Sequence, residues 1–166
     1  MKRWVLRSAA VAALAVWVGG LVALGAVGAP QIFATLQQHD PIAGRELAGE
    51  VFGAIFARFQ HVAWGLAVVV LGSLGARAAL GPRPRRFGVR MWLTVSMLAY
   101  SLTTALYIAP AIDQIRNTTH GPVASLPDTD PARQQFGRLH GISNALMLAT
   151  IFAGAFLILI ELRDQH

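Results

Sequence analysis

Four long apolar stretches separated by short polar segments dominate this chain. Runs without a single charged residue cover 9–29, 59–76, 91–112 and 141–160, which are 21, 18, 22 and 20 residues long. A helix needs about 20 mostly apolar residues to cross about 30 Å of hydrocarbon. The pattern therefore predicts four membrane-spanning helices over about 5–29, 56–79, 91–112 and 137–161. We expect an all-α, integral membrane four-helix bundle that forms one transmembrane domain over residues 1–166.

The segments between these stretches refine the prediction. Apolar residues at three- and four-residue spacing from Leu47 to Phe56 predict an amphipathic helical extension over about 45–56, outside the bilayer and ahead of the second span. We expect polar connections over 30–44 and 113–130, and a fourth helix that begins at Pro131. The first apolar run exceeds the roughly 7–15 residues of a secretory signal, which favours a retained span.

The two halves of the chain resemble each other. The first and third spans end in GAPQIFATL and IAPAIDQIR, and the second and fourth begin with FARFQHVAWGL and FGRLHGISNAL. Pro30 precedes His61 by 31 positions, and Pro110 precedes His140 by 30. This pattern indicates an internal repeat of two αα-hairpins in parallel orientation, related by an axis along the membrane normal.

Composition and charge agree with a membrane chain. Charged residues make up 13% of the sequence, against about 25% in soluble domains, and cysteine is absent. The net charge of +6 accompanies no nucleic-acid-reading motif, so nucleic acid is not an expected partner. With the amino terminus inside, the inner flanks hold nine Lys or Arg residues and the outer side five. This bias predicts both termini in the cytoplasm, as expected for a multi-pass protein of a bacterial inner membrane.

Polar side chains near the outer ends of the spans form the candidate site. His61 and His140 occupy matching positions in the two halves, and Tyr107 lies three residues before Pro110. Ser96, Tyr100, Thr103, Thr104 and Tyr107 form a hydroxyl stripe on the third span, which should face the bundle interior. Because His61, His140 and Tyr107 should lie at a similar depth near the outer face, we predict an outward-facing cavity there. Its candidate ligand-binding residues are His61, Tyr107, His140, Asn144, Ser143 and Tyr100.

Several chemistries fit such a site. His61 and His140 could ligate a metal such as copper or zinc, or the iron of a haem, or could relay protons. Alternatively, each histidine only caps its helix or hydrogen-bonds to a neighbouring one. A dedicated copper or zinc site would need a further ligand, His39 or His120, from the loops. We assign no catalytic residues and do not expect an enzyme, because Ser143 lacks the context of a nucleophile.

A stripe of small residues offers a surface for another helix. Ala15, Gly19 and Ala23 recur every four residues on the first span. Such a face allows close helix approach, within this bundle, in a homo-oligomer or against a membrane partner.

Much of the chain resembles a known family. VWVGGLVALGAVGAPQIFATL, AGEVFGAIFARF, IAPAIDQIR and FGRLHGISNALML are similar to the small four-span membrane family related to transmembrane protein 205, which is largely of unknown function. The first span also resembles membrane domains of the copper-resistance-D type, which implies a link to copper. The resemblance implies an integral membrane protein and supplies no catalytic residues.

We therefore expect a membrane protein that binds or passes a small ligand or ion, with a metal among the candidates. A structural or assembly subunit without a ligand is the alternative, and a bis-histidine haem redox protein is a third reading.

Overall fold

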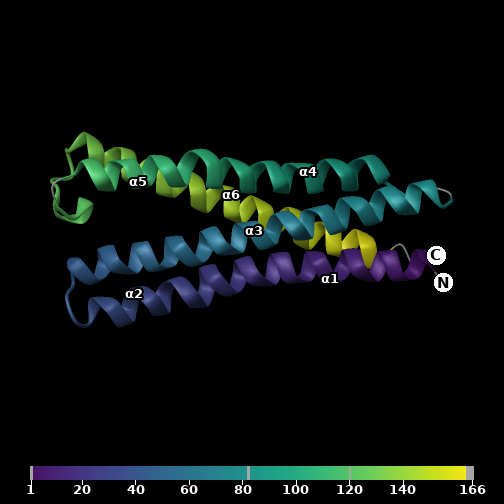
Figure 1. The fold of residues 1–166 in the computed structure, drawn as a ribbon, viewed down its shortest axis with the longest axis horizontal. Helices are drawn as coiled ribbons and strands as arrows, with labels where there is room; N and C mark the ends of the chain where they lie inside the picture. Colours follow the sequence, from purple (N-terminus) through teal and green to yellow (C-terminus); the bar gives the residue numbers. More distant parts are fainter. Residues whose placement is uncertain (1, 82, 120, 164–166) are drawn as a thin grey trace.

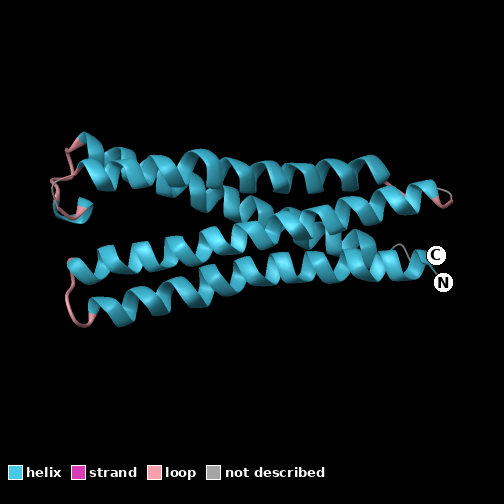
Figure 2. Cartoon of the chain, viewed as in Figure 1, coloured by secondary structure: helices cyan, strands magenta, loops and turns pink. Residues whose placement is uncertain are grey.

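A computed structural model describes residues 2–81, 83–119 and 121–163 of the chain. The helices are α1 (Lys2–Ala23), α2 (Ala29–Gln37), α3 (Ala43–Ala79), α4 (Phe87–Thr103), α5 (Ala109–Thr118) and α6 (Pro131–Arg163). Two π-helical turns, η1 (Leu24–Gly28) and η2 (Thr104–Ile108), join α1 to α2 and α4 to α5, and η3 (Val123–Ser125) is a short 3-10 turn. No strand occurs in the described residues, and the predicted all-α bundle is confirmed (Figures 1 and 2).

The helices continue through both Ala-Pro pairs and past the points where the sequence predicted polar connections to begin. The Ala29 N–H donates to the carbonyl of Leu24, and the Ala109 N–H donates to that of Thr104, each five residues back. This wider turn places Pro30 and Pro110 in the first turn of α2 and α5. An N–H is not needed there, so proline is tolerated and the helix goes on. The prediction that the first connection begins at Pro30 was wrong for this reason. The second connection was predicted to begin at Asp113, but α5 continues to Thr118, so both connections are shorter than expected.

Two other predicted features of the helices agree with the structure. Residues 45–56 are helical and continuous with the second span, all within α3. The fourth helix begins at Pro131, as predicted.

The four long helices form a ring in which each packs mainly on two others. α1 contacts α3 and α6, and α4 contacts the same two helices. The core between them includes Leu14, Trp17, Leu74, Met97 and Leu157, each at most 1% exposed. Because α1–α3 and α4–α6 are hairpin pairs, the ring joins the two halves of the chain along α1–α6 and α3–α4.

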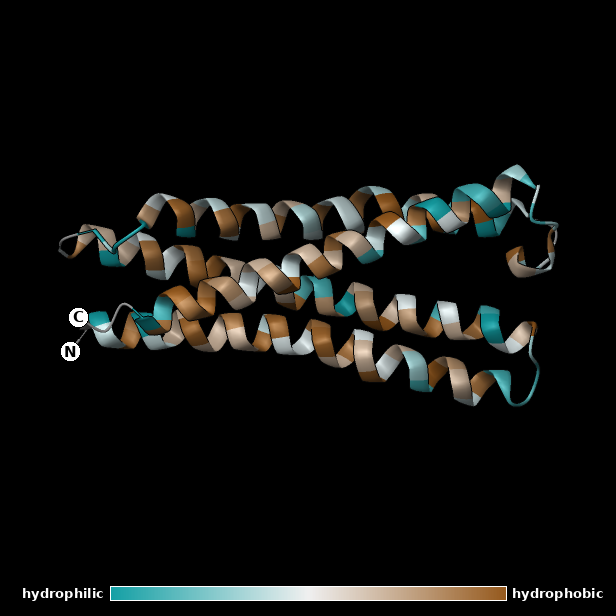
Figure 3. Cartoon of the chain, turned by 180° about the vertical axis from the view of Figure 1, so that it is seen from behind, coloured by the Kyte–Doolittle hydropathy of each residue, from teal (hydrophilic) through white to brown (hydrophobic). Residues whose placement is uncertain are grey.

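The outer surface of the ring fits a lipid bilayer. Four helices in the described residues are long and apolar enough to cross a membrane: Arg3–Gln37, Ala43–Ala79, Phe87–Thr118 and Pro131–Arg163. Large apolar side chains such as Val16, Val68 and Phe152 are exposed on them. Hydrophilic positions concentrate toward the helix ends, with a further hydrophilic stretch midway along α3, and hydrophobic positions fill most of the remaining length (Figure 3). The protein is therefore a multi-pass membrane protein, with its two termini at the same end of the bundle (Figure 1).

The two halves share a local irregularity. η1 and η2 each have five residues, and each directly precedes an Ala-Pro pair. This common position of the π-turns supports the predicted internal repeat, which stays a prediction.

Three charged side chains are buried at the end of the bundle that holds the termini. Glu161 of α6 accepts hydrogen bonds from Arg77 of α3 at 2.9 Å and from Arg90 of α4 at 2.6 Å. All three residues are at most 5% exposed. One carboxylate thus ties together the ends of three helices.

Candidate functional site

The two histidines of the predicted outward-facing site, His61 and His140, are both exposed, and they share no contact partner in the described residues. His61 Nδ1 lies 2.9 Å from the carbonyl of Ala57, and the His61 ring packs edge-on against Trp64, with ring centres 4.8 Å apart. His140 is stacked on Phe136, one turn earlier in α6, at 6.3 Å. Each histidine therefore contacts its own helix.

The other predicted residues divide between the surface and the interior. Tyr107 is 73% exposed, and Asn144 is exposed as well. Ser143 is half-buried, as is Tyr100. In the described part of the chain, no hydrogen bond or ring contact joins any two of the six predicted ligand-binding residues. The pocket predicted around them stays a prediction.

The same holds for a metal or haem at His61 and His140. The described residues contain no group of three or more His, Cys, Asp or Glu side chains that could hold a metal ion. His39 is exposed, with its Nδ1 3.3 Å from the carbonyl of Thr35, and His120 lies outside the described residues. Ligation by the histidine pair therefore rests on the sequence alone.

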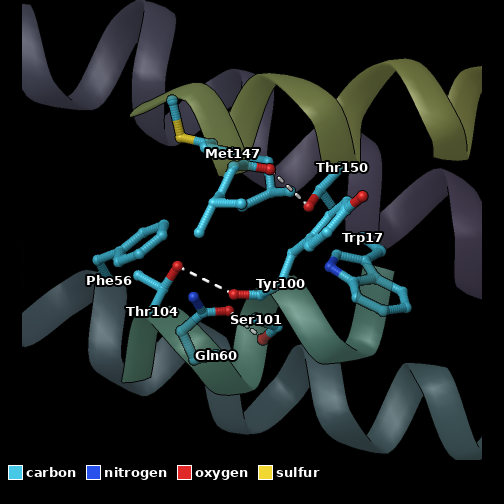
Figure 4. Close-up of a pocket in the computed structure, with 10 residues that line it drawn as sticks. Trp17, Phe56, Gln60, Tyr100, Ser101, Thr104, Met147 and Thr150 are labelled. Carbon is cyan, nitrogen blue, oxygen red and sulfur yellow. Dashed lines mark hydrogen bonds between the residues drawn. The ribbon is translucent and has the colours of Figure 1, made fainter. Parts of the chain in front are cut away.

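The interior polar cluster of the bundle lies around a small cavity between α1, α3, α4 and α6 (Figure 4). Six residues with polar side-chain atoms line it: Trp17, Gln60, Tyr100, Ser101, Thr104 and Thr150. Leu21, Phe56, Leu146 and Met147 complete the wall. The volume open to the centre of a water-sized sphere is about 10 Å³, roughly what one water molecule requires.

A chain of hydrogen bonds orders one side of the cavity. The Trp64 indole N–H donates to Ser101 Oγ at 3.0 Å, and Ser101 Oγ donates to Gln60 Oε1 at 2.6 Å. Gln60 and Ser101 are 4% and 5% exposed, so this network is shielded from competing solvent. It fixes the amide of Gln60 with its oxygen turned to α4.

Three donors on the cavity wall have no partner in the described part of the chain. Trp17 is fully buried, and its Nε1–H donates no hydrogen bond. No hydrogen bond engages the amide nitrogen of Gln60, whose oxygen is used by Ser101. The hydroxyl of Tyr100, whose ring reaches toward α6 near Thr150, likewise has none (Figure 4). Of these three atoms, the Trp17 Nε1 is the one that is itself buried from solvent. A buried N–H without a partner costs about 1–3 kcal/mol, so an acceptor beside the Trp17 indole would be stabilised.

The threonines beside the cavity are already satisfied by their own helices. Thr104 Oγ1 donates to the carbonyl of Tyr100 at 3.0 Å, and Thr150 Oγ1 donates to that of Leu146 at 2.9 Å. Their hydroxyl oxygens can still accept a hydrogen bond. No charged side chain is among the residues that line the cavity, which makes the site electrically neutral.

The sequence also matches the family model described as "Domain of unknown function (DUF4149)" over residues 12–120. This region holds 109 of the 166 residues, well over half of the chain. The chain belongs to the DUF4149 family. No curated protein and no solved structure matches it. The likenesses to transmembrane protein 205 and to copper-resistance-D domains stay predictions.

The DUF4149 region contributes most of the cavity. It runs from within α1 to just beyond α5 and contains Trp17, Gln60, Tyr100, Ser101 and Thr104. Thr150 and Met147 come from α6, beyond the matched residues. The cavity therefore forms only when the fourth span packs against the other three.

Sequence reasoning found part of this DUF4149 site and missed the rest. Tyr100 and Thr104 belong to the hydroxyl stripe that was expected to face inward, whereas Tyr107 of the same stripe is exposed. Trp17, Gln60, Ser101 and Thr150 were not among the predicted site residues. Gln60 carried a usable signal, because an amide inside an apolar run needs a polar partner in the bundle.

Proposed function

We propose that this DUF4149 protein binds, or passes across the membrane, a small uncharged ligand that accepts hydrogen bonds. The proposed site is the cavity around Trp17, Gln60 and Tyr100. The proposal rests on one observation, the buried Nε1 of Trp17 that has no hydrogen bond in the described residues and lines a small polar cavity.

The chemistry of the wall selects the class of ligand. Unpaired N–H and O–H groups favour an oxygen or nitrogen acceptor, such as a water molecule or the oxygen of a carbonyl, ether or alcohol. A charged ligand would meet no compensating side chain in this low-dielectric interior, and its desolvation would remain uncompensated. Polar groups at this depth are costly to keep unless they serve a function, which favours a ligand over a purely structural cluster.

The size of the cavity sets what can enter without rearrangement. About 10 Å³ admits one water molecule. A larger ligand needs the side chains of Phe56 and Met147 to move, since both form part of the wall. Methionine adapts its shape readily because it is unbranched and has three rotatable bonds.

Cysteine accessibility tests whether solutes reach the cavity, and the absence of native cysteine makes the assay clean. Thr104→Cys places a thiol on the cavity wall, and Thr94→Cys places one at a fully buried position of the same helical segment, away from the cavity. We expect the Thr104→Cys protein to react with a small membrane-impermeant thiol reagent and the Thr94→Cys protein to remain unmodified. Because the reagent is larger than water, its entry requires Phe56 and Met147 to move, and equal protection of both thiols would contradict the entry of any ligand of that size.

Applying the reagent to one side of sealed vesicles at a time separates binding from passage. Modification of the Thr104→Cys protein from one side only supports a binding site, and modification from both sides supports a pathway. A reagent that reacts with both variants would instead indicate a loosely packed bundle.

A second experiment compares the cavity with the outward-facing site predicted around His61 and His140. Small molecules are extracted from the purified protein and identified by mass spectrometry. We expect Gln60→Leu and Tyr100→Phe to lose the ligand, while His61→Ala and His140→Ala retain it. The reverse result would assign the ligand to the histidine site, and retention by all four variants would contradict both.

The structural or assembly role remains the second candidate, because the small-residue stripe is exposed. Ala15, Gly19 and Ala23 all lie on the surface of α1, and a Cβ at Gly19 would meet nothing within 4 Å. Another helix could therefore approach α1 closely along this face.

The haem reading has a direct spectroscopic test. An absorption spectrum of the detergent-purified protein with a Soret band that is lost in His61→Ala or His140→Ala would support it. A metal found by elemental analysis without that band would support a transition-metal site instead.

We also propose that the protein resides in a bacterial inner membrane with both termini in the cytoplasm. The nine-to-five bias of Lys and Arg residues between the two sets of flanks supports this orientation.

A further inference from the structure

A groove runs between α1 and α6 at the end of the bundle that holds the termini, well away from the cavity. It is lined by Trp4, Arg7, Ser8, Val11, Ala12 and Leu162, and its volume is about 320 Å³. Arg7 and Ser8 lie near the amino terminus of α1, with Leu162 of α6 at the level of Arg7. Val11 and Ala12 lie about one turn further along α1, so the groove becomes apolar in that direction.

Arg7 is held in a fixed position inside this groove. Its Nη2 donates to the carbonyl of Glu161 at 2.5 Å and to that of Leu162 at 3.3 Å, in the last turn of α6. A guanidinium has five N–H donors, and no other hydrogen bond in the described residues engages those of Arg7. Its remaining N–H groups are thus available on a side chain whose orientation is already fixed.

The surroundings match the boundary between lipid headgroups and hydrocarbon. Trp4, at the rim of the groove, is 70% exposed, as an interfacial tryptophan would be. In the sequence, the segments that meet at this end contain nine Lys or Arg residues against Glu161 and Asp164. An anion is therefore favoured here by the overall charge as well as by Arg7.

We propose that this groove binds an anionic phospholipid, with the phosphate on Arg7 and an acyl chain along Val11, Ala12 and Leu162. Arginine suits the phosphate because its planar donors match phosphate oxygens. The apolar floor favours a lipid over free phosphate, which would leave that surface uncovered. This proposal does not depend on the function proposed for the cavity.

The exposed indole of Trp4 provides the readout, because bromine on a lipid acyl chain quenches tryptophan fluorescence at contact. The protein is reconstituted in phosphatidylcholine with increasing fractions of brominated phosphatidylglycerol, or of brominated phosphatidylcholine. Subtracting the signal of Trp4→Phe isolates Trp4 from Trp17, Trp64 and Trp92. We expect phosphatidylglycerol to reach half-maximal quenching at about a fivefold lower fraction, the factor expected for one arginine beside an anionic headgroup.

Arg7→Gln should remove this preference, and Arg83→Gln, which changes an exposed arginine outside the groove, should retain it. Equal quenching of Trp4 by the two brominated lipids in the unaltered protein would overturn the proposal. Loss of the preference in both variants would also overturn it, because it would indicate a diffuse charge effect.

Two further variants keep the test decisive if Arg7→Gln does not fold. Arg7→Lys retains the charge and should keep a preference for phosphatidylglycerol. Ala12→Leu occupies the floor of the groove with Arg7 intact and should weaken quenching by brominated phosphatidylglycerol. Inorganic phosphate at millimolar concentration should leave the preference unchanged, and its displacement of the lipid effect would assign the site to free phosphate instead.

Discussion

At the scale of single residues, the buried ion cluster at the termini end shows how strongly stability depends on one carboxylate. Glu161 accepts hydrogen bonds from both Arg77 and Arg90, and the side chains of all three are at most 6% exposed. Removing one partner of a buried charge group leaves the others desolvated and uncompensated. Glu161 therefore matters less for the attraction it adds than for the two charges it keeps satisfied.

We predict that Glu161→Ala lowers the free energy of unfolding by about 3–5 kcal/mol, the cost typical of breaking a buried ion pair from one side. The matched control is Asp128→Ala, which removes a carboxylate bound to Arg133 at 2.7 Å on the surface. Asp128 is 88% exposed at its side chain, so its loss should cost less than about 1 kcal/mol. Reversible unfolding in mixed detergent micelles measures both, and equal stability of the two variants would contradict the role given to Glu161.

Sequence reasoning could locate these residues but not join them. The cluster links residues 84 and 71 positions apart, and such pairing depends on how each helix is rotated in the bundle. The same limit applies at the site. Gln60 is 4% exposed while its neighbour His61 is exposed, because successive helical residues point about 100° apart. The sequence did not show which of these two neighbouring positions lies on the buried face of α3.

At the scale of elements, neighbouring glycines on α1 have opposite surroundings. A Cβ at Gly20 would collide with the ring of Phe59 on α3, whereas a Cβ at Gly19 would meet nothing within 4 Å. Gly20 thus leaves the space on α1 that the ring of Phe59 occupies. Gly19 lies on the exposed stripe with Ala15 and Ala23.

The two positions therefore predict different outcomes for the same substitution. Gly20→Leu should lower the free energy of unfolding by about 1–3 kcal/mol, the usual cost of overpacking. Gly19→Leu should leave the stability of the monomer unchanged and weaken any self-association through the stripe. Thermal unfolding and chemical crosslinking in native-like membranes measure the two effects. If Gly19→Leu alters neither crosslinking nor co-purifying partners, this stripe is only a lipid-facing surface.

The limits of the elements were predictable where periodicity or capping preferences apply. The extension over 45–56 and the start of α6 at Pro131 followed from apolar spacing and from the preference of proline for a first turn. The π-turns were not predictable in this way. A proline in a helical pattern ordinarily ends or kinks the helix, and nothing in the local sequence says that a five-residue bond will precede it.

At the scale of the whole molecule, the number of spans and the all-α class were predictable because both follow from one-dimensional hydropathy. In a bilayer, a backbone that crosses hydrocarbon must satisfy its own hydrogen bonds, so a run of about 20 apolar residues has essentially one structure available. The cavity was less accessible, because it is assembled from four helices and its members lie between Trp17 and Thr150. The inward-facing part of the hydroxyl stripe on α4 and η2 pointed to it, and the amide of Gln60 inside an apolar run was a second, unused signal.

The proposed orientation of the molecule gives the last prediction. Four crossings place the two termini on one side, and the arginine-rich segment 81–90 should lie on that side too. A green fluorescent protein fused after the final residue should therefore fluoresce in the cytoplasm, and alkaline phosphatase inserted after Ser125 should be active outside.

The combined change of Arg83, Arg85 and Arg86 to glutamine lowers the inner count of Lys and Arg residues from nine to six, against five outside, and leaves the buried Arg77 and Arg90 intact. Because the bias then nearly vanishes, a mixed population should give both signals. Phosphatase activity of a fusion at the carboxyl terminus of the unaltered protein would contradict this orientation. It would then place the lipid groove, which lies at the end of the bundle that holds the termini, in the outer leaflet.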